Sequence, residues 1–146
     1  MPDIEQTMRF FSNARVLRLL DQDGRRRLID AAEALTFDDG ETVVREGEPG
    51  DALFIIVDGI ASVVVDDMGT SKPVAELTDG AFFGEMAVIT DQPRSATISA
   101  RGGLSVLRIP KEAVLGILDD YPKAKEMIAK IGVARTEDTM QKILED

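Results

Sequence analysis

Short apolar runs rich in β-branched residues, separated by glycines, fill the middle of the chain. Turn residues at intervals of about ten, with such runs between them, are typical of an all-β sandwich or barrel. This pattern predicts a mainly β core with seven strands. They are Leu35–Phe37, Thr42–Arg45, Ala52–Asp58, Ile60–Asp66, Val74–Thr78, Arg94–Ala100 and Leu104–Ile109.

The run Ala52–Asp58 is apolar on both of its faces. Successive side chains of a strand point to opposite faces, so the run divides into two sets. These are Leu53, Ile55 and Val57 on one face and Phe54 and Ile56 on the other. A strand with both faces apolar is buried on both sides, and we therefore expect it to be central.

Helical periodicity precedes and follows the β region. Residues 3–34 carry apolar residues at spacings of three and four, with Asp21 or Asp23 as a helix cap and Gly24 as a break. After Ile109, Pro110 predicts a helix through Leu118.

A last helix is expected to begin at Pro122 and to be interrupted at residues 136–139. Its apolar stripe consists of Ala124, Met127, Ile128, Ile131 and Ala134. Such a stripe predicts packing, and three roles stay open: a mobile lid, a dimer contact, or part of the core.

Composition limits the functions that are open to this chain. Its 146 residues are 44% hydrophobic and 30% charged, as expected of one soluble domain. Seventeen basic and 27 acidic residues give a net charge of -10, which argues against a nucleic-acid surface. An acidic N-terminus and the lack of a long apolar run predict a cytoplasmic protein without membrane contact.

Cysteine and histidine are both absent from the sequence. Their absence excludes disulfides, the usual zinc sites and the serine–histidine or cysteine nucleophile systems. We expect no catalytic residues, no metal and no enzymatic activity. Arg25–Arg27 is read as a solvated helix face, Asp66–Asp67 as part of a polar hairpin loop, and Asp119–Asp120 as capping or solvated charge.

The stretch Asp79–Ala100 has the features of an anion-binding site. Gly84 precedes a short apolar run, and a glycine before a helical turn lets free backbone N–H groups approach an anion. Arg94, nine residues after Glu85, offers a planar fork of donors that suits phosphate oxygens. Phosphate would repel Glu85, whose expected partner is a hydroxyl group, and phosphate plus hydroxyl indicates a nucleotide.

Residues 82–97, which contain FGEMAVITDQPRSAT, resemble the phosphate-binding cassette of the cyclic nucleotide-binding domain family. This family includes catabolite activators, kinase regulatory subunits and cyclic nucleotide-gated channels. The turn Glu46–Asp51 and glycines 40, 47, 50, 59, 80 and 84 also match its pattern. The resemblance implies one domain: N-terminal helices over 1–34, a jelly-roll-like β-roll over 35–109, and C-terminal helices, including a lid, over 110–146.

The resemblance also implies roles for individual residues. Arg94 would pair with the cyclic phosphate, Glu85 would accept from the ribose 2'-hydroxyl, and backbone N–H groups near Ala87 and Ser95 would complete the cradle. The implied ligand-binding residues are Phe83, Gly84, Glu85, Met86, Ala87, Arg94, Ser95 and Ala96, with Val63, Ala75 and Leu77 lining the purine.

The function implied is that of a non-catalytic sensor of a cyclic nucleotide. Members that prefer cyclic AMP commonly carry alanine after the arginine, and those that prefer cyclic GMP commonly carry threonine. This chain has Ser95, whose hydroxyl could contact guanine, but related bacterial and channel domains with a hydroxyl here also bind cyclic AMP, and cyclic AMP is therefore favoured over cyclic GMP. Binding would be transmitted through the C-terminal helix to a homodimer partner or an effector domain. The alternative is a domain of the same fold without ligand, serving as a protein–protein interaction or dimerisation module.

Overall fold

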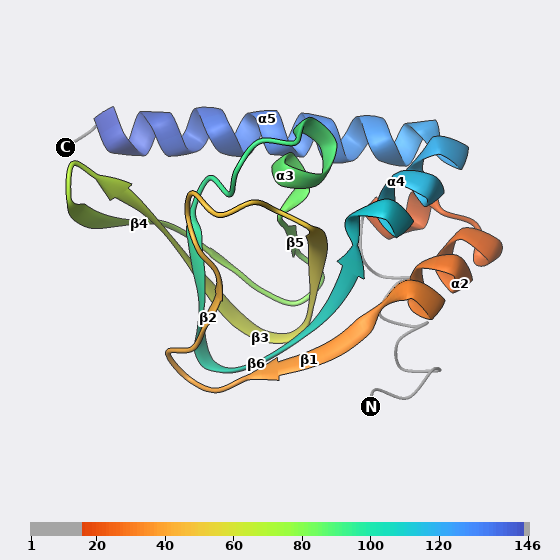
Figure 1. Cartoon of the computed structure of the whole chain (residues 1–146), viewed down its shortest axis with the longest axis horizontal. Coiled ribbons are helices and arrows are strands. Elements are labelled where there is room, and N and C mark those ends of the chain that lie inside the picture. The colour runs from red at the N-terminus through yellow and green to blue at the C-terminus, as the bar shows by residue number, and fades with distance from the viewer. Residues whose placement is uncertain (1–15, 145–146) are drawn as a thin grey trace.

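A computed structural model describes residues 16–144, except for the side chains of residues 16–17, 86–87 and 136–144. It is a rolled antiparallel sheet with helices at one end and along one side (Figure 1). Residues 3–15 of the expected N-terminal helices lie outside the described part. The helices are η1 (Val16–Leu19), α2 (Gln22–Ala31), α3 (Glu85–Thr90), α4 (Lys111–Asp120) and α5 (Pro122–Leu144).

The sheet is built around two long strands. Its order is β1-β6-β3-β4, with β2 also paired to β6 and β5 to β3, and all pairs are antiparallel. The strands are β1 (Glu33–Phe37), β2 (Thr42–Val44), β3 (Ala52–Asp67), β4 (Thr70–Leu77), β5 (Phe82–Phe83) and β6 (Thr97–Pro110). The prediction that Ala52–Asp58 lies in a central strand is confirmed, because β3 pairs with β6, β4 and β5.

Two pairs of predicted strands are single strands in the structure. Arg94–Ala100 and Leu104–Ile109 are joined in β6, which begins only at Thr97. Ala52–Asp58 and Ile60–Asp66 both belong to β3, which passes through Gly59 with only a shift in register. Gly59 has φ of 109°, and a Cβ atom there would collide with the carbonyl oxygen of Gly103. This glycine therefore bends a continuous strand where the sequence pattern suggested a turn.

Some predicted boundaries are also wrong. Glu33 and Ala34, expected in the N-terminal helices, open β1, because their backbone pairs with Arg108 and Leu107 of β6. The expected polar loop over residues 66–73 is mostly strand, since β3 and β4 stay paired until Asp67 meets Thr70. The two-residue strand β5 was not predicted, because two residues are too short to show a periodic pattern.

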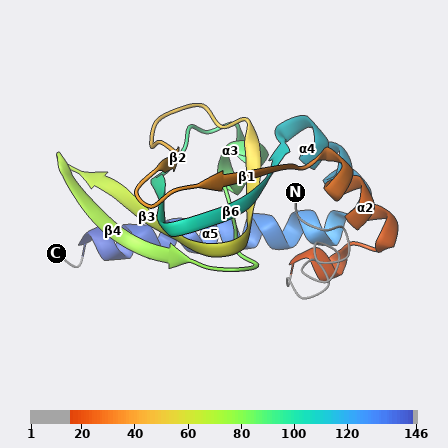
Figure 2. The ribbon, with the colours of Figure 1, turned by 90° about the horizontal axis from the view of Figure 1, so that it is seen from below.

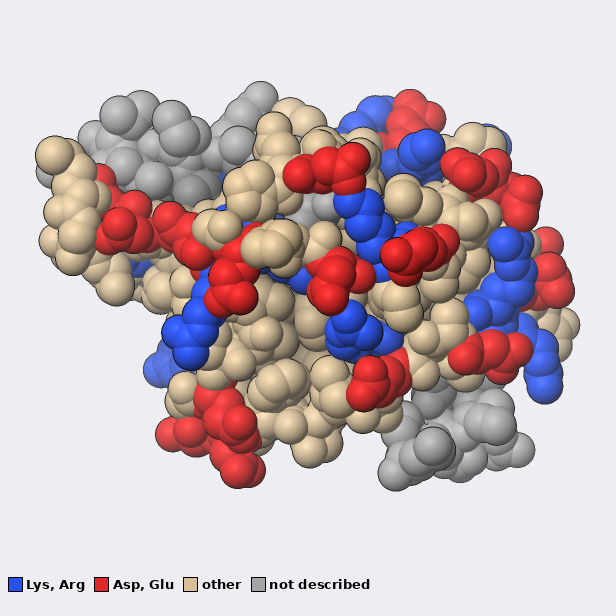
Figure 3. Space-filling model, viewed as in Figure 1, with Lys and Arg blue, Asp and Glu red and all other residues tan. Residues whose placement is uncertain are grey.

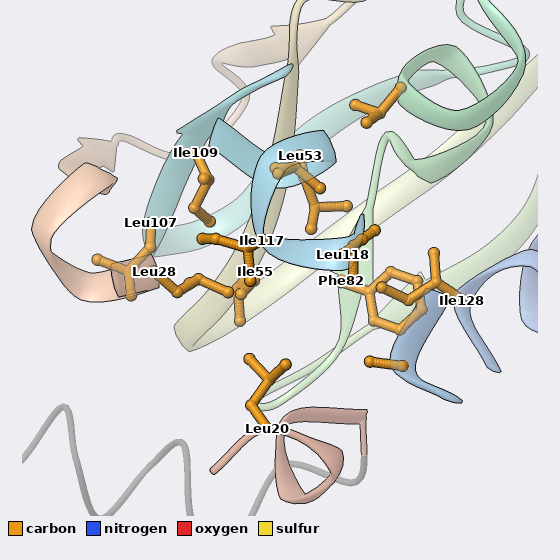
Figure 4. Close-up of a cluster of buried hydrophobic side chains, with 13 residues drawn as sticks. Leu20, Leu28, Leu53, Ile55, Phe82, Leu107, Ile109, Ile117, Leu118 and Ile128 are labelled. Carbon is orange, nitrogen blue, oxygen red and sulfur yellow. The ribbon is translucent and has the colours of Figure 1, made fainter. Parts of the chain in front are cut away.

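The two faces of β3 enter two apolar clusters, as the alternation predicted. Leu53 and Ile55 pack with residues of η1, α2, α4 and α5, between the sheet and the helices (Figure 4). Phe54 and Ile56 lie inside the roll with Phe83, Leu104 and Val106 and others. The helices thus cover one face of the long strands, and side chains from the other face fill the inside of the roll.

The junction between α4 and α5 is fastened to α2. Asp21 is the N-cap of α2, accepting from the Gly24 N–H at 2.9 Å, and it also accepts from the Tyr121 hydroxyl at the junction. Gly24 lies within α2 instead of breaking it, and its missing side chain makes room for the Tyr121 ring. Arg27 donates to Asp120 at 2.8 Å, so this arginine and this aspartate form an ion pair.

Helix α5 runs along the length of the molecule, past α3 and the roll (Figures 1 and 2). It is continuous through residues 136–139, where an interruption was predicted. Threonine and aspartate cost only a few tenths of a kcal/mol each in a helix interior, which is too little to end a long helix. Among the described helices, α5 included, none is both long and apolar enough to cross a membrane.

Candidate functional site

Gly84 makes the turn between β5 and α3. Its φ of 89° is in the left-handed region, which favours glycine. A Cβ atom there would touch Nη1 of Arg94 and lie 2.9 Å from the carbonyl oxygen of Ala52. The glycine therefore allows the close approach of the Arg94 side chain to this turn.

The side chain of Arg94 is buried beneath the turn, with 5% of its surface exposed. Nη2 donates to the Ala52 carbonyl at 3.1 Å and Nη1 to the Gly84 carbonyl at 3.4 Å. Its guanidinium carbon lies 5.7 Å from the centre of the Phe54 ring, which stacks on Phe83. These contacts hold the guanidinium in one place but are made to groups without net charge.

The charge of Arg94 is only weakly compensated. Its ion pair with Asp51 is 4.0 Å long, and the Asp51 side chain is 78% exposed. Burial lowers the pKa of Arg94, while the charges of Asp51 and Glu85 raise it. A buried cation whose hydrogen bonds go to carbonyl groups is a site that an anion would stabilise.

Glu85, the first residue of α3, is also buried, and it contacts α5. Nη1 of Arg135 donates to Glu85 Oε1 at 3.0 Å and to the Phe82 carbonyl at 2.6 Å. The Arg135 guanidinium also lies 4.8 Å from the centre of the Phe82 ring. One side chain of α5 thus binds three groups next to Gly84. Arg135 was not predicted, because a single arginine beside an apolar stripe is typical of any helix surface.

The backbone of Arg94 is fixed by the loop before β3. Gly47 N–H donates to the Arg94 carbonyl and Arg94 N–H to the Glu48 carbonyl, both at 2.8 Å. Glu46 N–H donates to the Thr97 hydroxyl at 3.0 Å. The turn Glu46–Asp51, which the sequence predicted as a turn that resembles the family's pattern, thus holds the segment that carries Arg94.

The structure brings Gly84, Glu85 and Arg94 together. The other predicted site residues belong to β3, β4, β5, α3 and the segment after Arg94. Phe83 packs in the core; Ser95 is exposed and Ala96 half-buried. Val63 pairs across the strands with Ala75, and Val63 and Leu77 pack on the inner cluster while Ala75 is exposed. Met86 and Ala87 lie in α3, and their side chains are outside the described part.

Charged residues are mixed on the surface. On the face in Figure 3, Lys and Arg alternate with Asp and Glu. Within residues 16–144, as far as their side chains are described, no cluster of three or more acidic residues is arranged to hold a metal ion.

Comparison with known proteins identifies relatives of this chain. The model of the cyclic nucleotide-binding domain family matches residues 34–121. The cAMP-dependent protein kinase regulatory subunit of Dictyostelium discoideum is 39% identical over 107 residues, which are 70% of this chain and 33% of that protein.

Two solved structures have the same fold. A chain described as cAMP-bound PfPKA-R superposes with a TM-score of 0.84 at 25% identity, over 94% of this chain and 46% of that one. The regulatory subunit of a cAMP-independent protein kinase A from Trypanosoma cruzi, bound to guanosine, gives 0.71 at 26% identity, over 88% and 50%. The chain thus spans about a third to a half of the length of these relatives.

Proposed function

The chain belongs to the cyclic nucleotide-binding domain family, and we propose that it binds a cyclic nucleotide as a non-catalytic sensor or regulatory module. The observation that carries this proposal is the buried guanidinium of Arg94. Its hydrogen bonds go to two backbone carbonyls, and Asp51 lies 4.0 Å away. A cyclic phosphate would supply the short, charge-assisted hydrogen bonds that the Asp51 pair does not provide.

The ribose and the base of the ligand would occupy the surroundings of Arg94. Glu85 would accept from the 2'-hydroxyl with one carboxylate oxygen while Arg135 remains on the other, since a carboxylate has acceptor sites on both oxygens. Backbone N–H groups of Ala87 and Ser95 would complete the phosphate contacts. Val63 and Leu77, which are half-buried, and Ala75, which is exposed, would line the purine.

We favour cyclic AMP over cyclic GMP as the ligand. The Dictyostelium relative is named as cAMP-dependent, and the PfPKA-R chain is described as cAMP-bound. The Trypanosoma cruzi relative is bound to guanosine, which has no phosphate. Arg94 supports a phosphate-containing ligand here, because a nucleoside would leave its buried charge uncompensated.

Helix α5 is the proposed output element. Arg135 joins it to Glu85 and Phe82, which lie on either side of the turn at Gly84. A ligand that contacts Glu85 therefore acts on a group that also binds α5. Such a ligand shifts the position of α5 if it has different affinities for the protein with α5 in two different positions. The exposed surface of α5, including Val133, would face a homodimer partner or an effector domain.

The alternative is a domain that uses this fold for protein–protein interaction without a ligand. Calorimetric titration of the purified chain with cyclic AMP, cyclic GMP and guanosine separates the two functions. We expect saturable one-to-one binding of cyclic AMP, weaker binding of cyclic GMP and no binding of guanosine. A folded, nucleotide-free sample that binds none of the three would favour the interaction module.

Removal of residues 136–146 tests the proposed output. We expect truncation at Arg135 to change either the affinity for cyclic AMP or the oligomeric state measured by light scattering. An unchanged affinity together with an unchanged oligomeric state would refute transmission through α5.

A further inference from the structure

A second arginine, Arg108, lies beside the phosphate site proposed above. It belongs to β6, where its backbone pairs with Phe54 of β3 on one side and Glu33 of β1 on the other. Residues directly opposite in an antiparallel pair share a face of the sheet, so Arg108 lies on the face of Phe54. The guanidinium of Arg94 lies over the ring of Phe54, and the two arginines are therefore neighbours.

Both arginines contact the carboxylate of Asp51, but at different distances. Nη2 of Arg108 donates to Oδ2 at 3.0 Å, whereas Nη2 of Arg94 is 4.0 Å from Oδ1. Glu33 lies on the far side of Arg108, with Oε2 at 3.9 Å from Nη1. Asp51 is thus hydrogen-bonded to the arginine that lies outside the predicted cassette.

The backbone of Asp51 is fixed, but its side chain is exposed. Its carbonyl oxygen accepts from the Lys111 N–H at 2.8 Å, and the next residue, Ala52, accepts from Arg94. With 78% of the side chain in solvent, other rotamers of Asp51 are open to it. The contact that selects the observed position is the hydrogen bond from Arg108.

An unrestrained Asp51 would compete with the ligand. Arginine and carboxylate form short, often bidentate pairs when they can reach each other, and such a pair would occupy the donors that a phosphate needs. Burial is the main cause that lowers the pKa of Arg94. The negative charge of Asp51 raises this pKa and the positive charge of Arg108 lowers it, so Arg94 interacts with both residues. Movement of Asp51 onto Arg94 would therefore neutralise the phosphate site.

We infer that Arg108 is a positioning residue of the nucleotide site: it holds the Asp51 carboxylate away from Arg94 and so keeps the Arg94 guanidinium available to phosphate. This inference rests on the proposed function for its effect on binding. Its structural part, the position of Asp51, does not depend on any ligand.

The binding test is a double-mutant cycle in the full chain, with affinity for cyclic AMP measured by calorimetry. We expect Arg108→Gln to weaken binding about tenfold, or 1.4 kcal/mol. Combined with Asp51→Asn, the same substitution should cost less than about threefold, because the competing charge is gone. Arg101→Gln is the matched control, since Arg101 is an exposed arginine of the same strand, paired with Glu76.

Equal losses from Arg108→Gln with and without Asp51→Asn would overturn the inference, because they would mean that Arg108 acts through its own charge. Binding by Arg108→Gln equal to that of Arg101→Gln would overturn it too. Melting curves identify any variant that fails to fold.

A structure of the ligand-free Arg108→Gln variant gives the second test. We expect an Asp51 oxygen within about 3 Å of an Arg94 nitrogen, the usual distance of a charge-assisted hydrogen bond. If Asp51 keeps its 4.0 Å separation from Arg94, the inference is wrong, whether or not the chain binds a nucleotide. If the parent chain binds no cyclic nucleotide while Asp51 moves as expected, the proposed function fails and the positioning role stands.

Discussion

Arg135 of α5 donates from one nitrogen, Nη1, to both Glu85 Oε1 and the carbonyl oxygen of Phe82. Glu85 lies 50 residues before Arg135, and 6% of its side chain is exposed. The residue that resembles the family's ribose-binding glutamate is therefore also the residue that the last helix binds. Under the proposed function, a ligand that contacts this shared carboxylate would also act on α5.

Replacement of Arg135 tests this link. We expect Arg135→Ala to lower the free energy of unfolding by about 1–3 kcal/mol, because it leaves a buried carboxylate without its partner. It should also weaken cyclic AMP binding, because Glu85 loses the contact that orients it. Chemical denaturation and calorimetry measure the two effects.

Lys130→Ala is the control for Arg135→Ala. Lys130 lies on the same helix, is exposed, and forms a surface pair with Glu126 that is worth little. If Arg135→Ala and Lys130→Ala have the same small effects, the contact between Arg135 and Glu85 does not couple α5 to the site.

Gly84→Ala is expected to impair stability and binding together. An alanine at φ of 89° is strained, which costs more than about 1 kcal/mol, and its Cβ atom would push Arg94 from its place. Gly80→Ala provides a matched control, because Gly80 has φ of 86° with open space around it. We expect similar destabilisation from backbone strain in both, and loss of cyclic AMP affinity in Gly84→Ala alone. Equal affinities of the two variants would contradict the packing of Arg94 on Gly84.

The hydrogen bond between Tyr121 and Asp21 predicts a dependence of stability on pH. The bond raises the pKa of Tyr121 above 10.0 and lowers the pKa of Asp21 below 3.8. A raised tyrosine pKa means that the stabilisation is complete below pH 10.0 and is lost as the pH rises through the folded pKa. A lowered aspartate pKa means that the aspartate part is present above pH 3.8 and is lost as the pH falls through the folded pKa.

Tyr121 is the only tyrosine of the chain, and tryptophan is absent, so ultraviolet absorbance of tyrosinate follows this one group. We expect its midpoint to lie above that of the unfolded chain in denaturant, and to fall toward it in Asp21→Asn. Tyr121→Phe should lower the free energy of unfolding at neutral pH. It should also remove the part of the loss of stability at alkaline pH that is caused by ionisation of Tyr121. A midpoint equal to that of the unfolded chain would rule out the bond in solution.

Local patterns in the sequence predicted the parts of the fold that depend on neighbouring residues. The cap at Asp21, the alternation through Phe54 and Ile55, and the central place of their strand are confirmed. The resemblance of residues 82–97 to the cyclic nucleotide-binding family is confirmed by the family match. Each of these signals is contained within a short stretch of chain, where spacing alone determines geometry.

Contacts between distant segments could not be predicted in this way. Arg135 reaches Glu85 because α5 passes along α3, and Arg108 reaches Asp51 because β6 lies next to β3. Neither arginine differs in its local sequence from a surface residue. The extension of β3 and β4 to Asp67 and Thr70 was not predicted for the same reason. Backbone pairing between the two strands, rather than a side-chain pattern, extends them.

The central claim is that Arg94 binds the phosphate of a cyclic nucleotide, and its most direct test is calorimetric titration of the parent chain and of Arg94→Ala with cyclic AMP. Removal of one partner of a buried, hydrogen-bonded charge pair costs about 2 to 5 kcal/mol, so we expect binding to weaken by roughly thirtyfold to several thousandfold. Arg45→Ala, at an exposed arginine, should bind like the parent. If Arg94→Ala binds cyclic AMP as tightly as the parent does, the site is not where this account puts it.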